Sequence, residues 1–125
     1  MSDVQLSTLA EALQRYPMGY VLTANGDRAP HASPVSIELE AGVLVVSGIG
    51  RHTRENAVRQ PAVGLVWPPQ SAEDYSLFVD GTAEVTEGGM RVTPTRAVLH
   101  RPVPSPVPKD AGTCQSDCIE LAFAP

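Results

Sequence analysis

The sequence predicts a mainly β protein: an antiparallel sheet of six or seven strands that closes wholly or partly into a barrel, with two short helices. Several segments alternate apolar and polar residues with the period of two that a strand buried on one face requires. Short turns rich in glycine, asparagine and aspartate separate these segments, and such turns join antiparallel neighbours. Closing the sheet is the usual way to remove its exposed edges.

The N-terminal segment, residues 1–17, is predicted to hold an amphipathic helix over residues 2–15. Ser2 can cap this helix, with Gln5 as its capping-box partner, and Pro17 ends it. Apolar residues recur at helical spacing and form one stripe, at Leu6, Leu9, Ala10 and Leu13.

The next segments indicate three consecutive strands. Residues 19–24 form the first, and Asn25-Gly26-Asp27 is a strong turn signal. Residues 35–40 alternate apolar with polar side chains, so this strand has one buried and one wet face. After a turn at residues 41–42, residues 43–47 (VLVVS) read as a strand buried on both faces.

A second short helix is expected over residues 53–60, capped by Thr53 and ended by Pro61. A hairpin turn is expected at residues 87–89. The strand after this turn contains Pro94, which indicates an edge strand or a bulge. Further strands are expected at residues 62–67, 76–86, 92–100 and 118–123. We place residues 1–125 in one domain, whose segment 102–125 combines a proline-rich stretch in polyproline geometry with the last strand.

Composition excludes several functional classes. The chain has 125 residues, 42% of them hydrophobic, with a formal net charge of −5 and a pI near 5.0. This acidity argues against a nucleic-acid binder, which needs an extended basic face. No apolar run approaches the roughly 20 residues that span a bilayer, and the N-terminus lacks the features of a signal peptide. We therefore expect a soluble cytoplasmic protein that binds neither nucleic acid nor membrane.

The two cysteines, Cys114 and Cys118, lie four residues apart. In an extended chain this spacing separates them by about 13 Å, too far for a disulfide, although a turn could bring them together. A metal site would need further ligands at a familiar spacing, which the sequence does not offer. We favour two ordinary thiols in a reducing compartment and assign no metal site.

Residues 47–56 (SGIGRHTREN) are the main candidate site, because they concentrate basic side chains in an acidic chain. The glycines leave the backbone accessible. Thr53 would lie at a helix N-terminus, where free N–H groups and the helix dipole attract anions. Arg51 and Arg54 flank it, and guanidinium groups suit phosphate oxygens. The segment is therefore either a phosphate site or a solvated turn that binds nothing specific.

The chain as a whole resembles the pyridoxamine 5′-phosphate oxidase-like, FMN-binding split-barrel family. The resemblance covers about residues 5–101 and rests on "PHASPVSIE", "GRHTRENAVRQPAV" and "YSLFVDGTAEV" in that order. The segment "TPTRAVLHRP" is similar to a small actinobacterial-type branch, and the "HT" pair to a haem-utilisation branch. The resemblance implies an antiparallel split β-barrel that binds FMN and forms a homodimer with cofactor sites at the interface.

The same resemblance places the cofactor site. The family's phosphate-binding pair falls on His52 and Thr53, with Arg51 and Arg54 in place of the lysine expected at this position. The strand beside the flavin ring begins at His31, and polar residues from the second subunit fall near Tyr75 and Ser76. The Trp67-Pro68-Pro69 segment is either an interface element or an ordinary strand end. The implied cofactor-binding residues are Arg51, His52, Thr53, Arg54, Asn56, Ala32, Ser33, Pro34, Val35, Ser36, Tyr75 and Ser76.

The function implied is that of a flavin-dependent oxidoreductase acting on a small molecule. The redox chemistry would be the cofactor's own, so we assign no catalytic acid or base. The C-terminal Trp and Arg with which pyridoxamine-phosphate oxidases hold their substrate have no counterpart after residue 101, so that substrate is not implied. Three alternatives stay open. One is a deazaflavin-dependent reductase of the same fold. Another is a non-catalytic binder of flavin or haem, with His52 as the iron ligand in the haem case. The third is a degenerate barrel that binds no ligand.

Overall fold

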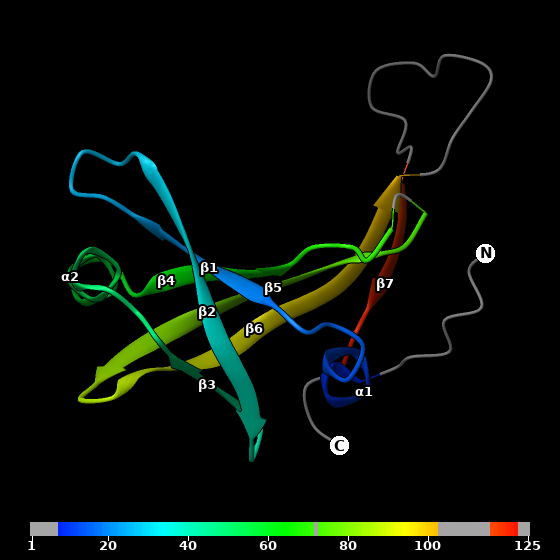
Figure 1. Cartoon of the computed structure of the whole chain (residues 1–125), viewed down its shortest axis with the longest axis horizontal. Helices are drawn as coiled ribbons and strands as arrows, with labels where there is room; N and C mark the ends of the chain where they lie inside the picture. Colours follow the sequence, from blue (N-terminus) through cyan, green and yellow to red (C-terminus); the bar gives the residue numbers. More distant parts are fainter. Residues whose placement is uncertain (1–7, 72, 103–115, 123–125) are drawn as a thin grey trace.

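The computed structural model describes residues 8–71, 73–102 and 116–122 of the chain. Their order is one helix, three strands, a second helix and four further strands (Figure 1). The helices are α1 (Leu9–Leu13) and α2 (Arg51–Arg59). The strands are β1 (Gly19–Ala24), β2 (Pro30–Glu40), β3 (Val43–Ser47), β4 (Ala62–Trp67), β5 (Ser76–Thr86), β6 (Gly89–Pro102) and β7 (Ser116–Glu120).

Six of the strands close into an antiparallel barrel. The sheet order is β3-β2-β1-β4-β5-β6-β7, and β3 also pairs with β6, which joins the two sides. Strand β6 can serve two neighbours because it is long: β3 pairs with its start, Gly89 to Val92, and β7 with its end, Val98 to Pro102. The predicted mainly β barrel with two short helices is confirmed. Figure 1 shows α1 and α2 at opposite ends of the molecule.

Strands β1, β3, β4 and β5 have the predicted bounds, and the other three differ. β2 begins at Pro30 instead of residue 35, because it pairs with β1 back to Ala24. β6 runs over residues 89–102 instead of 92–100, since its start closes the barrel against β3. Pro94 sits at a register shift in the β5–β6 ladder, which confirms the predicted bulge at a residue that cannot donate a backbone hydrogen bond. β7 covers residues 116–120 instead of 118–123.

Helix α1 is much shorter than the predicted 2–15 helix. Its cap is Thr8, whose hydroxyl accepts from the Glu11 N–H at 3.3 Å, while the Glu11 carboxylate accepts from the Thr8 N–H at 3.2 Å. Because a cap has extended backbone, the helix cannot continue before Thr8. The predicted cap at Ser2 lies outside the described residues. Ala10, placed on the apolar stripe, is exposed, and Ala12 is buried instead.

The core fills the inside of the barrel. Alternate residues of each strand point inward, and Leu9 and Ala12 of α1 pack against them. Val43 and Val45 of β3 are only half-buried, so this strand is not covered fully on both faces as predicted. Fully buried members include Val21, Leu65, Leu77, Val79, Val92 and Leu99. No helix among the described residues is long and apolar enough to cross a membrane.

Candidate functional site

The start of α2 differs from the prediction in a way that bears on the site. The helix begins at Arg51, not residue 53, and its N-cap is Gly50, so the predicted cap at Thr53 is wrong. The first helical bond runs from the Arg54 N–H to the Gly50 carbonyl at 3.0 Å. Glycine has no side chain with which to cap. The backbone N–H groups of Arg51, His52 and Thr53 therefore have no acceptor among the described residues.

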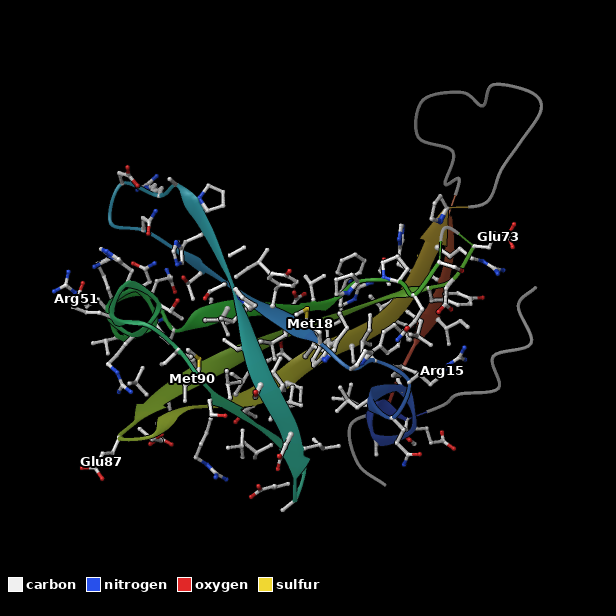
Figure 2. All side chains as sticks on the ribbon, in the orientation of Figure 1. Arg15, Met18, Arg51, Glu73, Glu87 and Met90 are labelled. Atoms are coloured by element: carbon white, nitrogen blue, oxygen red, sulfur yellow. The ribbon has the colours of Figure 1, made fainter. Side chains whose placement is uncertain are left out.

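The surroundings of this helix end are basic. α2 carries three arginines and one glutamate, and its first turn contains no acidic residue. Arg51 and His52 are exposed, and the Arg51 guanidinium has no hydrogen bond or ion pair within the described part of the chain. Figure 2 shows Arg51 at the outer side of α2, pointing away from the barrel. An uncapped helix end with a cation beside it is suited to holding an anion.

His31 of β2 approaches the same helix end. The His31 and His52 ring centroids lie 6.4 Å apart, with their planes inclined by 55°. His31 reaches this position because it pairs with Thr23 at the far end of the β1–β2 ladder. Two predicted parts of the site, the basic segment and the start of β2, thus lie side by side. No pattern in the sequence signals this contact, since it depends on how α2 packs against the barrel.

Arg54 differs from Arg51 because its guanidinium is already used. Its Nη1 donates to the Thr86 carbonyl at 2.6 Å, and its Nη2 donates to the Glu87 carbonyl at 3.3 Å. These bonds fasten the first turn of α2 to the β5–β6 hairpin. In this structure Arg54 positions the helix, which leaves Arg51 as the arginine available to a ligand.

Asn56 is buried and connects α2 to β1. Its Nδ2 donates to Thr23 Oγ1 at 3.0 Å and to Asn25 Oδ1 at 2.9 Å, while its Oδ1 accepts from Arg59 Nη2 at 2.7 Å. Because a guanidinium only donates, Arg59 fixes which amide atom is the oxygen. All three contacts lie within the protein, so Asn56 serves the site by holding the helix.

The other β2 residues predicted for the site divide between two faces. Ser33 and Val35 are half-buried and share the inner face with their partners Val21 and Gly19. The alternate residues are exposed on the outer face, and these are Ala32, Pro34 and Ser36. His31, which contacts His52 at the α2 end, alternates with Ala32 and therefore shares the inner face with Ser33 and Val35.

Tyr75 and Ser76 lie far from α2 within one chain. They stand at the start of β5, whereas Arg54 contacts its end at Thr86. Ten residues of strand span about 33 Å. Tyr75 is buried, its carbonyl accepts from the Tyr16 hydroxyl at 2.7 Å, and the Arg101 guanidinium carbon lies 4.5 Å from its ring centroid.

Within the described part of the chain, the sulfur and acidic groups form no metal site. Among the described residues, no three His, Cys, Asp or Glu side chains are grouped closely enough to hold a metal ion. Cys118 is a free, exposed thiol at the β6–β7 ladder, and Cys114 lies outside the described residues.

Comparison with known proteins supports the fold. No family model matches the chain. Uncharacterized proteins of Mycobacterium bovis and Mycobacterium tuberculosis are each 36% identical to it over 132 aligned positions, which cover 93% of this chain and 93% of theirs. A solved F420 reductase matches with a TM-score of 0.59 at 19% identity, covering 74% of this chain and 98% of its own. A haem-binding protein from Mycobacterium smegmatis has the same TM-score and identity, covering 94% of this chain and 59% of its own. At this identity the two structures show a shared split-barrel fold and no more.

Proposed function

This chain belongs to the family of the two mycobacterial proteins, and we propose that it is a split-barrel protein that binds FMN by its phosphate at the N-terminus of α2. The observation that carries the proposal is the uncapped helix end, with three backbone N–H groups lacking acceptors among the described residues. A dianionic phosphate is the kind of group that such an end, with Arg51 beside it, binds most favourably.

The fit of the residues to FMN can be assessed part by part. The N–H groups of Arg51, His52 and Thr53 and the Arg51 guanidinium would hold the phosphate. The half-buried face of β2 that His31 shares with Ser33 and Val35 would lie beside the remainder of the cofactor. A bound flavin supplies the electron transfer, so the chain's own task is to anchor and orient it. We therefore propose a flavin-dependent oxidoreductase acting on a small molecule.

We propose that the protein is a homodimer. Ser76 lies at the far end of β5 from the α2 site of its own chain, so a second copy would have to supply it to that site. Tyr75 is buried within its own chain and would support Ser76 without contacting the cofactor. An apolar groove of about 410 Å³ lies on the outer face of the sheet, where Leu22, Val66 and Phe78 contribute to it. We propose that a second copy packs on this face. Phe78→Asp should yield a monomer in analytical ultracentrifugation, whereas Ala10→Asp, exposed on α1 and away from this face, should remain a dimer. Equal masses for the native protein and Phe78→Asp would refute the proposal.

Two other cofactors have specific support. The likeness to an F420 reductase favours a deazaflavin held in the same way. The likeness to a haem-binding protein favours haem, with the exposed His52 as the iron ligand and His31 next to it. Both are alternatives to FMN for the same region.

The visible absorption spectrum of the purified protein tests these possibilities directly. It should be recorded before and after adding FMN, a deazaflavin or haemin, followed by gel filtration to remove unbound compound. We expect flavin bands to co-elute with the protein and to bleach with a nicotinamide donor. A sharp haem band instead would favour the haem binder, bound flavin that no donor reduces would favour a non-catalytic binder, and loss of all three compounds on the column would refute cofactor binding.

A further inference from the structure

Strands β1 and β2 separate at one end of their ladder and leave an opening there. The β1–β2 ladder ends at the Gly19–Val35 pair, whereas β2 continues to Glu40 with β3 as its neighbour on one side. Pro17 precedes β1 and cannot extend the ladder. Figure 1 shows the end of β2 running away from the start of β1. A pocket of about 290 Å³ opens in this gap, between β2, the segment before β1 and the end of β4.

Trp67 at the floor of this pocket carries a hydrogen-bond donor for which no described residue provides an acceptor. Trp67 is only 2% exposed and lines the pocket, yet its indole N–H has no hydrogen-bond partner among the described residues. Every fully enclosed side-chain nitrogen or oxygen of those residues does have a partner. The indole nitrogen is therefore not fully enclosed, and it is reached through the pocket. Water can bond this donor in the free protein, and a ligand acceptor in the pocket would take the place of that water.

Gly19 keeps the indole nitrogen accessible. A Cβ at this position would lie 2.9 Å from Trp67 Nε1 and 2.9 Å from Ile37 Cδ1, so any side chain here would fill the space over the N–H. Gly19 itself lines the pocket. Its backbone is not in the left-handed region, so close approach, and not conformation, is the reason for glycine here.

From this geometry we infer that the pocket binds a small neutral organic molecule whose carbonyl oxygen accepts a hydrogen bond from Trp67 Nε1. An indole N–H can only donate, so the ligand must present an acceptor. Met18, Val35 and Ile37 supply apolar contacts on part of the pocket, and the rest of its exposed lining is mainly polar, which suits a small molecule with polar groups. The Glu38 carboxylate at the pocket disfavours an anion. The volume suits a compact molecule, at the lower end of ligand sites. This site does not depend on the proposed phosphate anchor.

The test uses the fact that Trp67 is the only tryptophan, so the protein gives a single indole N–H signal in a ¹⁵N–¹H correlation spectrum. The probes are cyclohexanone and methylenecyclohexane, which share a shape but differ in the acceptor oxygen. Cyclohexanone should move the indole signal downfield in a saturable way. Methylenecyclohexane should bind about three- to tenfold more weakly, the worth of one net hydrogen bond, and without the downfield shift. An indole signal that ignores cyclohexanone, or that responds equally to both compounds, would overturn the inference.

Three variants locate the binding. Gly19→Ala should abolish the response by covering the N–H. Because this change can disturb the fold, Ser36→Leu provides a second block from an exposed position that lines the pocket, and it should weaken cyclohexanone binding at least about tenfold. Thr82→Leu, exposed on β5 and not lining the pocket, is the matched control and should bind as the native protein does. Unchanged cyclohexanone binding in Ser36→Leu would place the ligand elsewhere and refute the site.

Discussion

Replacing Asn56 with leucine should loosen α2 from the barrel. The substitution removes three hydrogen bonds, to Thr23, Asn25 and Arg59, from a side chain that is 4% exposed. A neutral hydrogen bond contributes about 1 kcal/mol net, and one to a charged donor about 1.5–3 kcal/mol, a value that exposure of Arg59 reduces. The added apolar burial offsets part of the loss. We expect the free energy of unfolding to fall by about 3 kcal/mol.

Urea unfolding followed by the fluorescence of the single tryptophan, Trp67, measures this change. The matched control is Glu55→Leu, the same new side chain at the preceding, exposed position, which should shift the unfolding free energy by less than about 0.5 kcal/mol. A loss below about 1 kcal/mol in Asn56→Leu, or an equal loss in Glu55→Leu, would show that the Asn56 contacts do not hold the helix.

Three further predictions concern stability. Arg54→Ala should lower the free energy of unfolding, measured in urea, by about 1–2 kcal/mol, because it removes the hydrogen bonds from α2 to the β5–β6 hairpin. An unchanged free energy of unfolding would mean that these hydrogen bonds do not contribute to stability. Burial, with a smaller contribution from Asp74, raises the pKa of Tyr16 from 10.0 to about 12. The native state thus holds this proton more tightly than the unfolded chain, so the stabilisation present below pH 10 is lost as the pH rises towards 12. Between pH 10 and pH 12 the free energy of unfolding should fall by up to about 2 kcal/mol more in the native protein than in Tyr16→Phe. Equal falls in the two proteins would contradict the raised pKa of Tyr16. Gly89→Ala should cost about 3 kcal/mol by thermal unfolding, because a Cβ there collides with the Val46 carbonyl oxygen; an unchanged Tm would refute this.

The strands could be predicted from sequence because their signals are local. Residues 43–47 and 76–86 carry their own alternation or apolar run, and adjacent turn residues set their ends. The sequence predicts that the sheet closes, but not which strands close it. Nothing in the residues of β3 indicates that its second partner is Gly89–Val92 of β6. The lengths of β2 and β6 depend on that pairing. For this reason their bounds differed from the alternation pattern.

The local structure around the candidate site could be predicted only in outline. The basic segment after a strand marked the N-terminus of α2, yet both Gly50 and Thr53 are acceptable caps by residue type. Tertiary packing decides between the two caps. Thr53 is only 1% exposed because it lies within α2, on the side that packs against the barrel, and the helix therefore begins before it. Two of the three partners of Asn56, Asn25 and Thr23, lie 31 and 33 residues away, and no local pattern indicates them. The different roles of Arg51 and Arg54 likewise depend on where the β5–β6 hairpin turns.

The phosphate anchor is tested most directly by comparing the dissociation constants of FMN and riboflavin, which differ by the phosphate alone. Titrations should be made on the native protein, on Arg51→Ala and on Arg15→Ala, a control arginine near α1 that Figure 2 shows at the opposite end of the molecule. We predict that the native protein and Arg15→Ala bind FMN at least about tenfold more tightly than riboflavin, and that Arg51→Ala loses most of this difference. Equal affinities for FMN and riboflavin in the native protein, or a preference that survives in Arg51→Ala, would contradict the proposal.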